Sequence, residues 1–354
     1  MTLYPKLIMD ALATVVYAGT KKNLVESGMV ADTPSINGMK VRVVLEFPRD
    51  TDPFLKSTVK AAEAAIHYHV SKDVEVDIVT EFKSKPRPKD EDLLPGVKHI
   101  VAVSSGKGGV GKSTVAVNLA VALARLGWRV GLLDTDIFGP SIPKMLGVEG
   151  EKVYAVNKDG RDLIVPVEKY GVKFLSIGFF VAPSTATLWR GGMACNALKQ
   201  LLADSDWGEL DYLILDTPPG TSDIHLTLLQ TLKLTGAVIV STPQQVALAD
   251  ARKGIDMYQN EKVGVPILGL VENMAWFTPA ELPQNRYYIF GREGCKRLAE
   301  EMHVPLLAQI PLVQSICDNG DAGTPVVTNI DSLSGQTFLS LGQAVVTVVN
   351  RLNK

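Results

Sequence analysis

The residues best suited to chemistry in this sequence lie in the segment GKGGVGKST, which runs from position 106 to position 114. Glycines let the backbone turn its N–H groups inward around phosphate oxygens, and a helix that follows them adds a favourable partial positive charge. Lys112 is spaced to reach the β- and γ-phosphates of a nucleotide, and Ser113 to ligate Mg²⁺. The segment therefore predicts a phosphate-binding loop, although its spacing alone does not separate ATP from GTP.

Two flanking segments support this interpretation of the loop. The apolar run IVAVSS before it predicts a strand, and the run TVAVNLAVALARLG after it predicts a helix. Strand, glycine loop and helix in this order are the context in which a phosphate-binding loop works. A glycine-rich turn that binds nothing is the alternative, and it does not account for every fixed position of the motif being filled.

Aspartates end two further apolar runs. Asp134 and Asp136 lie two positions apart in VGLLDTD, and Asp216 ends YLILD. Residues two apart on an extended chain share one face. Asp216 stands where a Walker B aspartate holds Mg²⁺, and the loop 217–221 after it is predicted to respond to the γ-phosphate. Aspartates at strand ends also serve as simple caps, and this alternative stays open.

The apolar runs also predict the fold class. Strands at IVAVSS, VGLLDTD, YLILDT, AVIVST and ILGLVEN alternate with helical stretches, which predicts an α/β fold with a mostly parallel sheet covered by helices. The run IPLVQSI has a strand-like pattern, and residues 333–354 predict a final amphipathic helix. We expect the carboxyl ends of these strands to carry the site.

The first part of the chain has a different pattern. Residues 1–85 predict a small α+β domain, with a strand at 40–47, a helix at 52–69 and a strand at 74–82. Residues 86–97 are rich in charge and contain prolines, so they predict a linker. The nucleotide-binding domain is then expected to occupy residues 98–354.

Composition limits the location and the partners of the protein. Its 354 residues carry a net charge of −2, which gives no general electrostatic attraction to nucleic acid or to anionic membranes. The N-terminus lacks the pattern of a signal peptide, and no stretch approaches the ~20 apolar residues of a membrane span. We therefore expect a cytoplasmic protein with no nucleic-acid partner and no membrane partner.

Lys107 is a second lysine in a loop whose ordinary form needs one. With it, the segment KGGVGKS resembles the deviant Walker A motif of the MinD, ParA and nitrogenase iron-protein class of dimeric P-loop ATPases. The resemblance implies a homodimer in which Lys107 crosses to the partner's nucleotide and acts in trans, as an arginine finger does. It further implies that Asp136 positions the attacking water and that Asp134 belongs to the magnesium shell.

The resemblance also defines the set of residues that should contact nucleotide. Asn273, which ends the run ILGLVEN, fits the position where this class hydrogen-bonds the adenine, although an asparagine there also forms turns. The expected catalytic residues are Lys107, Lys112 and Asp136, and the expected magnesium ligands are Ser113, Asp134 and Asp216. The expected ATP-binding residues are Gly106, Lys107, Gly108, Gly109, Val110, Gly111, Lys112, Ser113, Thr114 and Asn273.

Longer segments resemble one branch of this class, the Mrp/ApbC/NBP35 ATPases, which are regarded as carriers of iron–sulfur clusters to apoproteins. They include DTDIFGPSIPKMLG, WRGGMACNALKQLL, DYLILDTPPGTSDIHLTL and YIFGREGCKRLAEEMHVPLLAQIPL. The resemblance covers residues 98–345, and residues 1–85 are similar to the MIP18-like domain that bacterial members carry. It implies ATP, Mg²⁺ and an iron–sulfur cluster as bound groups, and a second copy and apoprotein clients as partners.

The sequence departs from the branch at the cluster site. Members that carry clusters have a Cys-x-x-Cys shortly after the Asn-Met segment, whereas this chain reads NMAWFTPAELPQNRYYIFG there. Thr278, Glu281 and Gln284 offer no soft ligand in place of the thiolates. Cys295 lies near the start of a predicted helix whose N-terminus should lower the thiol pKa, so it is a candidate to donate one ligand per subunit at the dimer axis, and Cys317 is a second candidate. The alternative for both is an ordinary packed thiol.

Two hypotheses on function therefore stay open. One is an ATP-hydrolysing carrier that delivers iron–sulfur clusters to apoproteins. The other is a nucleotide-switched dimeric adaptor for iron–sulfur or other client proteins that carries no cluster itself. A positioning ATPase of the MinD or ParA kind fits less well, because the C-terminal tail SLGQAVVTVVNRLNK has few basic residues and the net charge of −2 suggests no basic surface for DNA.

Overall fold

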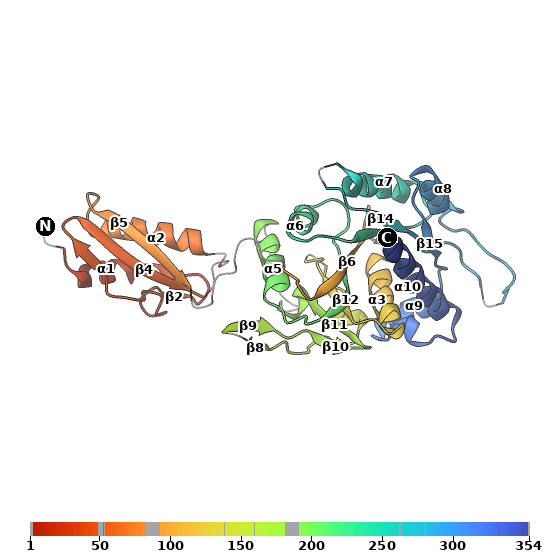
Figure 1. The fold of residues 1–354 in the computed structure, drawn as a ribbon, viewed down its shortest axis with the longest axis horizontal. Coiled ribbons are helices and arrows are strands. Elements are labelled where there is room, and N and C mark those ends of the chain that lie inside the picture. Colours follow the sequence, from red (N-terminus) through yellow and green to blue (C-terminus); the bar gives the residue numbers. More distant parts are fainter. Residues whose placement is uncertain are drawn as a thin grey trace. The chain divides into compact units, whose positions relative to one another are not determined.

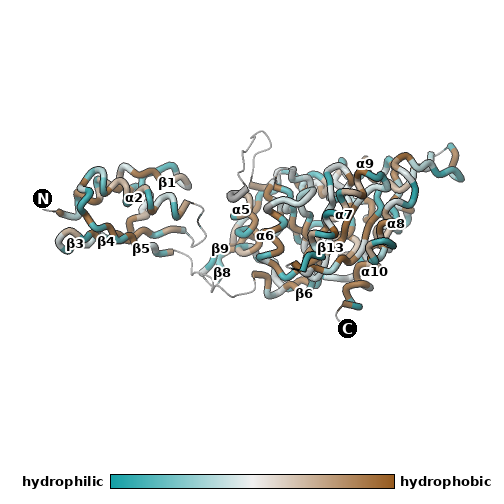
Figure 2. Tube along the Cα trace, turned by 90° about the horizontal axis from the view of Figure 1, so that it is seen from above, coloured by the Kyte–Doolittle hydropathy of each residue, from teal (hydrophilic) through white to brown (hydrophobic). Residues whose placement is uncertain are grey.

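A computed structural model describes residues 3–48, 52, 54–82, 93–137, 139–158, 160–180, 191–261, 263–279 and 281–352, with only the backbone described at 191–193 and 223. The chain divides into two compact units. One comprises Met1–Glu91 and Val156–Asp162, and the other comprises Asp92–Ala155 and Leu163–Lys354. Hydrophobic residues are distributed through both units (Figure 2), and each unit has its own buried core.

The smaller unit is a sheet covered by helices. Its elements are α1 (Pro5–Leu12), β1 (Val16–Tyr17), β2 (Lys22–Asn23), β3 (Ser35–Asn37), β4 (Lys40–Phe47), α2 (Leu55–His69) and β5 (Glu75–Phe82). The main sheet has the order β3-β4-β5, in which β4 and β5 run parallel and α2 provides the crossover between them. The predicted strand at 40–47 is confirmed, and the predicted helix begins three residues later than expected, at Leu55.

Alternating buried and exposed residues along β4 explain which face of this sheet forms the core of the smaller unit. Val41, Val43, Leu45 and Phe47 have no exposed surface, and the residues between them on β4 are exposed or half-buried. Successive side chains of a strand point to opposite faces, so these four share the face that packs on the helices. The smaller unit therefore folds around an apolar layer of its own.

The larger unit contains an eight-stranded sheet. Its strands are β6 (Val97–Ser104), β7 (Val130–Asp134), β10 (Val167–Lys169), β11 (Val172–Ser176), β12 (Leu210–Asp216), β13 (Gly236–Ser241), β14 (Ile267–Glu272) and β15 (Leu306–Gln309), and a separate hairpin is formed by β8 (Ala155–Lys158) and β9 (Arg161–Ile164). Its helices are α3 (Lys112–Arg125), α4 (Ile142–Met145), α5 (Gly191–Ala203), α6 (Asp223–Thr231), α7 (Gln245–Gln259), α8 (Gly294–Glu301), α9 (Gln314–Asp321) and α10 (Leu333–Leu352), with short 3₁₀ helices at Ile177–Phe179 and Val326–Thr328.

Helices cover both faces of this sheet, as the apolar strands predict. The strand order is β10-β11-β7-β12-β6-β13-β14-β15, and every neighbouring pair is parallel except β10 with β11. Helices α3 and α10 pack on one face, and α5 to α8 pack on the other (Figure 1). The mostly parallel α/β architecture is therefore confirmed, with one antiparallel strand at the edge.

Strand register brings the predicted acidic residues to one edge of the sheet. Asp216 at the end of β12 pairs with Asp134 at the end of β7 and with Val103 on β6. The strands that follow β6 in the chain lie on both sides of it in the sheet. Ligands of open α/β sheets bind at such a switch point, beyond the carboxyl ends of the strands.

Some expectations differ from the structure or fall outside it. The strand predicted at IPLVQSI is wrong, because Gln314–Asp321 is helical. Most of the linker predicted at 86–97 lies outside the described residues, and the domain boundaries stay a prediction. No helix among the described residues combines the length and the apolar character that crossing a membrane requires.

An ion cluster ties together the amino ends of three central strands. Asp211 on β12 accepts hydrogen bonds from Lys98 Nζ on β6 at 2.9 Å, and from Arg129 N, Nε and Nη2 before β7 at 3.0–3.1 Å. Asp211 is 8% exposed. The hydrogen bonds from Arg129, and then that from Lys98, hold the pKa of the Asp211 carboxyl well below its usual range.

We predict that Asp211→Asn lowers the free energy of unfolding at pH 7 by about 2 kcal/mol, because an amide places a donor against Lys98 and Arg129. A lowered folded-state pKa contributes stability above the ordinary aspartate pKa of about 3.9, and this contribution is lost as the pH falls through the folded value. The difference between the two proteins should therefore shrink in acid. All four tryptophans lie between positions 128 and 276, so urea unfolding followed by tryptophan fluorescence reports on the larger unit.

Glu149→Gln is the matched control, since its pair with Lys144 is 61% exposed on the glutamate side and should contribute little. Equal stability of Asp211→Asn and the parent protein at pH 7 would contradict the prediction.

Candidate nucleotide-binding site

The predicted phosphate loop joins β6 to α3. Gly111 is the N-cap of α3 with φ 84°, and Gly109 has φ 81°, a left-handed conformation that favours glycine. Gly106 meets a different constraint, because a Cβ atom there would lie 2.1 Å from the carbonyl carbon of Asp250 on α7. The glycines of the motif therefore permit two positive φ angles, at Gly109 and Gly111, and close approaches of other residues at Gly106 and Gly111.

A pocket of about 210 Å³ opens at this loop. It brings together residues of the phosphate loop, of the segment after β7 and of the loop after β12. Its lining consists of Ser105, Lys107, Gly108, Gly109, Gly111, Lys112, Ser113, Thr114, Asp136, Ser141, Met145 and Pro219. Lys107, Lys112, Ser113 and Asp136, predicted from separate sequence motifs, thus share one cavity.

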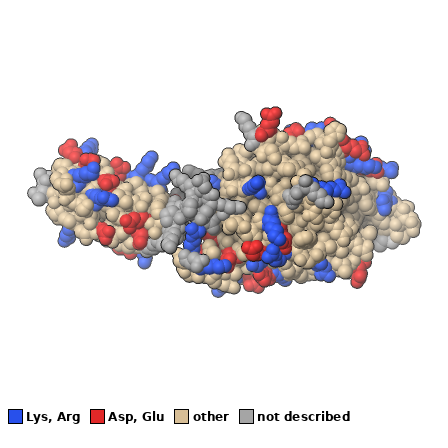
Figure 3. Space-filling view, in the orientation of Figure 1, with Lys and Arg blue, Asp and Glu red and all other residues tan. Residues whose placement is uncertain are grey.

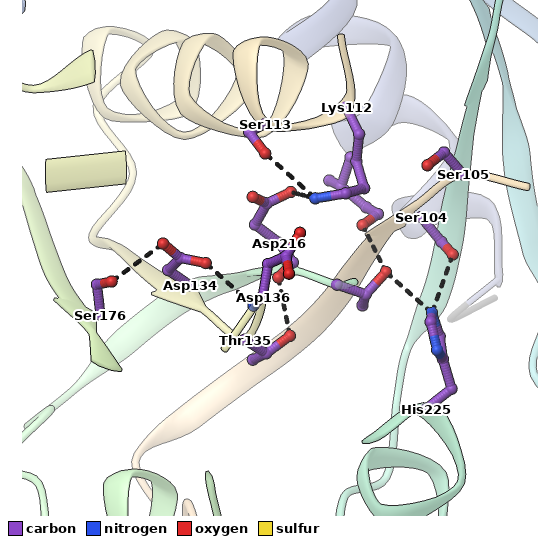
Figure 4. A network of polar contacts seen from close by, with 12 residues as sticks. Ser104, Ser105, Lys112, Ser113, Asp134, Thr135, Asp136, Ser176, Asp216 and His225 are labelled. Atoms are coloured by element: carbon purple, nitrogen blue, oxygen red, sulfur yellow. Dashed lines mark hydrogen bonds and ion pairs between the residues drawn. The ribbon is translucent and has the colours of Figure 1, made fainter. Parts of the chain in front are cut away.

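Lys112 is turned inward toward the sheet. Its Nζ lies 2.5 Å from Asp216 Oδ1 and 3.2 Å from Ser113 Oγ, and the residue is 7% exposed (Figure 4). A buried ammonium needs a counter-charge, and Asp216 supplies it here. Phosphate oxygens in the pocket would compete with Asp216 for the same ammonium.

The two strand-end carboxylates are buried side by side. Asp134 Oδ1 accepts from Asp136 N at 3.1 Å, and Asp134 Oδ2 accepts from Ser176 Oγ at 3.0 Å (Figure 4). Burial, and then the charge of Asp216, raise the pKa of Asp134 to about 8. Burial also raises the pKa of Asp216, although Lys112 opposes that rise. The pair is therefore short of positive charge.

This donor set fits a magnesium ion. Asp216 Oδ2 is buried and has no hydrogen-bond partner among the described residues, so one carboxylate oxygen is free to accept a cation. Mg²⁺ prefers oxygen ligands and is commonly held by one or two carboxylates together with substrate phosphates. Ser113, Asp134 and Asp216 are the residues that would hold it, and their role stays a prediction.

Asp136 and Lys107 lie at the pocket, and both are half-buried. The backbone N–H of Asp136 is held by Asp134, and the backbone carbonyl of Lys107 accepts from Ser105 Oγ at 3.0 Å. Both catalytic roles stay predictions.

Asn273 supports the phosphate loop from the end of β14. It is 7% exposed, and its Nδ2 donates to the carbonyl of Val110 at 2.8 Å. The same nitrogen would lie 2.2 Å from a Cβ at position 111, so it occupies the space that Gly111 leaves. This contact fixes the loop, and adenine recognition by Asn273 stays a prediction.

His225 is a site residue that the sequence did not single out. It is 1% exposed and contacts Ser104 of β6 (Figure 4). It also contacts Thr217 of the loop after β12. One signal was present in the sequence, since Ser222 followed by His225 has the spacing of a helix-capping box with histidine in place of the usual Glu or Gln.

The structure contradicts the expectation for Cys295. Cys295 has no exposed surface. Burial is the larger cause that raises the pKa of its thiol, and the charge of Glu272 is the next, whereas a lowered pKa was predicted. Glu272 Oε2 accepts from the Cys295 backbone N–H at 2.6 Å, so a carboxylate occupies the helix N-terminus that was expected to activate the thiol. Cys317 on α9 is exposed, and Cys195 on α5 is half-buried.

A glycine loop between a central strand and a helix, with buried aspartates at the two neighbouring strand ends, defines a P-loop nucleoside triphosphatase. Residues 96–346 match the model of the family described as NUBPL iron-transfer P-loop NTPase, and residues 6–78 match that of an iron–sulfur cluster assembly protein family. The chain belongs to the NUBPL iron-transfer P-loop NTPase family, and the resemblance to the Mrp/ApbC/NBP35 branch is confirmed.

Individual proteins agree with this assignment. The chain is 41% identical over 345 residues to the iron–sulfur cluster carrier protein of Synechocystis sp., covering 96% of this chain and 97% of that protein. A nucleotide-binding protein from Archaeoglobus fulgidus in complex with ADP superposes with a TM-score of 0.58 at 39% identity, covering 67% and 92% of the two chains. MinD from Pyrococcus horikoshii, solved with Mg-ADP, superposes at 0.51 with 24% identity over 72% and 98% of the chains, which confirms the MinD-like fold.

We predict that Lys112→Ala weakens binding of a fluorescent ADP analogue at least ~100-fold, because this buried lysine is expected to exchange its contact with Asp216 for the nucleotide phosphates. Lys253→Ala is the control, since Lys253 pairs with Asp250 on α7 and is 75% exposed. Both variants are first checked for folding by their melting temperatures. Unchanged affinity in folded Lys112→Ala would show that this loop is not the phosphate site.

Proposed function

We propose that this protein is an ATP-hydrolysing iron–sulfur cluster carrier that works as a homodimer and delivers clusters to apoproteins in the cytoplasm. The observation that carries the proposal is the shared pocket of Lys107, Lys112, Ser113 and Asp136 in a chain that belongs to an iron-transfer NTPase family. The match over residues 6–78 to an assembly-protein family supports a role in cluster delivery for the smaller unit as well.

ATP hydrolysis needs a water molecule placed in line with the γ-phosphorus. In our proposal Asp136 orients that water, whose oxygen bonds to the γ-phosphorus as the bond from phosphorus to the bridging oxygen breaks. ADP leaves with the bridging oxygen, and the γ-phosphoryl group leaves as inorganic phosphate with the water's oxygen. Lys112 exchanges its contact with Asp216 for the phosphates, and Lys107 of the partner subunit stabilises the charge that develops. A bound Mg²⁺ would neutralise phosphate charge beside Ser113 and Asp216.

Action of Lys107 in trans has a specific consequence for mixed dimers. Lys107→Ala and Asp136→Ala should each bind ADP with unchanged affinity and hydrolyse ATP slowly. In a mixed dimer, one site has an intact Asp136 and receives an intact Lys107 from its neighbour. An equal mixture should therefore regain about a quarter of the parent turnover per subunit, since half the dimers are mixed and half their sites are complete.

The measurement is phosphate release from the two variants alone and after mixing at equal concentration. The control is a mixture of Asp136→Ala with Lys112→Ala. In its mixed dimers one site lacks Asp136 and the other lacks Lys112, so no site is complete and mixing should give no gain in turnover. No gain on mixing the first pair would place Lys107 in its own site or outside catalysis.

The cluster site itself differs from that of the branch. The chain has three cysteines, none of them between Asn273 and Gly294, and Cys295 is buried. No group of three or more histidine, cysteine, aspartate or glutamate side chains that could hold a metal occurs within the described part of one chain. A cluster would therefore need ligands from two subunits, with exposed Cys317 as the accessible thiol.

The same observation favours a second candidate function. A nucleotide-switched dimeric adaptor, which binds client proteins without carrying a cluster, needs the P-loop and the smaller unit but no soft ligands. It uses every feature of the pocket described above. The two candidates differ only in whether iron and sulfide are bound.

Anaerobic reconstitution with iron and sulfide separates the two candidates. The carrier proposal predicts visible absorption and acid-labile sulfide at about one cluster per dimer, lost in Cys317→Ser and retained in Cys295→Ala, because a thiolate must reach the metal. Iron bound equally by the parent protein and by a variant without cysteine would be adventitious. Absence of bound iron and sulfide in the folded parent protein would exclude the carrier and favour the adaptor.

A further inference from the structure

The first and the last residue of the loop between β12 and α6 both contact the imidazole ring of His225. At its start, Thr217 Oγ1 lies 3.3 Å from His225 Nε2. At its end, the backbone N–H of Ser222 donates to His225 Nδ1 at 3.2 Å, and Ser222 Oγ lies 3.3 Å from the same nitrogen. His225 therefore bridges the residues that open and close this loop, while it belongs to the first turn of α6.

The loop lies directly against the phosphate loop. Gly220 N donates to the carbonyl of Ser105 at 2.9 Å, and a Cβ at position 108 would lie 4.0 Å from Pro219 Cγ. Pro219 of this loop also lines the nucleotide pocket, so a change in what the pocket holds would first alter the contacts of the loop and then those of α6.

The hydrogen bonds define one state of the imidazole. Because Nδ1 accepts from the Ser222 N–H, the ring proton lies on Nε2, which can donate to Thr217 Oγ1. Thr217 Oγ1 in turn donates to the carbonyl of Val103 on β6 at 3.0 Å. Burial, and then the charge of Lys112, lower the pKa of His225 to about 4, which agrees with a neutral ring.

The surroundings of His225 form a polar group inside an apolar core. Ser104 Oγ lies 3.5 Å from Nε2, and Ser104 and Thr217 are themselves buried. Ile224 and Leu228 on either side of His225 are each 2% exposed and belong to the core beneath α6. A buried polar group of this kind holds its members in one arrangement, because each lost hydrogen bond leaves an unsatisfied atom.

We propose that His225 is a positioning residue that couples the loop 217–222 to α6, so that the nucleotide state sensed by the loop is transmitted to that helix. The proposal rests on the ATP-dependent function given above. In this proposal His225 acts through its contacts with Thr217 and Ser222. A capping Glu or Gln serves the helix N-terminus alone in its usual role, whereas this imidazole joins that terminus to the residue that follows Asp216.

Hydrogen–deuterium exchange of the full chain tests the coupling directly. With a non-hydrolysable ATP analogue and Mg²⁺, compared with ADP and Mg²⁺, the amides of loop 217–222 and of α6 should gain protection together in the parent protein. His225→Met fills the space without polar atoms, so the gain in α6 should fall by more than half while the loop still responds. Its kcat should fall about 10- to 100-fold with KM within about twofold.

His225→Gln is the conservative counterpart of nearly equal volume. Its side-chain oxygen can accept from the Ser222 N–H, and its amide nitrogen can donate to Thr217, so the coupling and most of kcat should be retained. Leu228→Ala is the stability control, because it weakens the packing of α6 without touching the loop.

Each remaining outcome decides the proposal. Retained coupling in His225→Met, loss of coupling in His225→Gln, or equal uncoupling in Leu228→Ala would overturn it. Absence of joint protection in the parent protein would overturn it as well. If the parent protein binds the analogue but does not hydrolyse ATP, the proposed enzymatic function fails, and the exchange comparison still decides whether His225 couples the loop to the helix.

Discussion

The structure of the site depends on one electrostatic constraint, the burial of Asp134 and Asp216 as neighbours with Lys112 as the nearest cation. Parallel register places the two carboxylates at the ends of adjacent strands, and neither is more than 1% exposed. Two carboxylates cannot both ionise there without compensation. The Lys112 ammonium can turn toward phosphate oxygens at lower cost when another cation shares Asp216, so binding of nucleotide and of a divalent cation should be coupled. The free Oδ2 atom of Asp216 is where that coupling has room to occur.

Much of this arrangement could be predicted because it follows from local pattern and parallel strand geometry. Apolar runs that end in aspartate predict buried strands, and the carboxyl ends of parallel strands meet at one edge, so Asp134, Asp216 and the phosphate loop had to lie together.

The parts that could not be predicted depend on contacts between distant segments. His225 meets Ser104 across 121 positions, and Asn273 meets Val110 across 163. No periodicity or spacing carries that information. The edge strand β10 could not be predicted either, since a three-residue strand is too short to show a pattern.

At Cys295, the rule that a helix N-terminus lowers a thiol pKa gives a wrong prediction, because another group, the Glu272 carboxylate, binds at that terminus. The N-terminus of α8 has backbone N–H groups without partners inside the helix, which would favour a thiolate. Glu272, the last residue of β14, reaches that terminus instead and is held by the Cys295 N–H and by Gln309 Nε2 at 2.7 Å. The helix end therefore neutralises a buried carboxylate, and the thiol beside it experiences a nearby negative charge. The glutamate lies only 23 positions away, but its reach depends on how β14, β15 and α8 pack.

The segment that follows Asn273 lies largely at the surface, so its residues are less constrained than the buried charged residues of the nucleotide pocket. Several of its contacts are internal: Arg286 lies 4.5 Å from the centre of the Trp276 ring, Arg292 lies 5.1 Å from that of Tyr288, and Phe277 pairs with Tyr287 through backbone hydrogen bonds. It is also bound to the segment after β15, where Leu312 N donates to the Trp276 carbonyl. Leu282, Tyr287 and Ile289 are exposed, so changes there leave no unpaired charge in a core. Replacing Asp134, Asp216 or Lys112 would leave one. A surface segment of this kind therefore tolerates substitution more readily than the nucleotide pocket does.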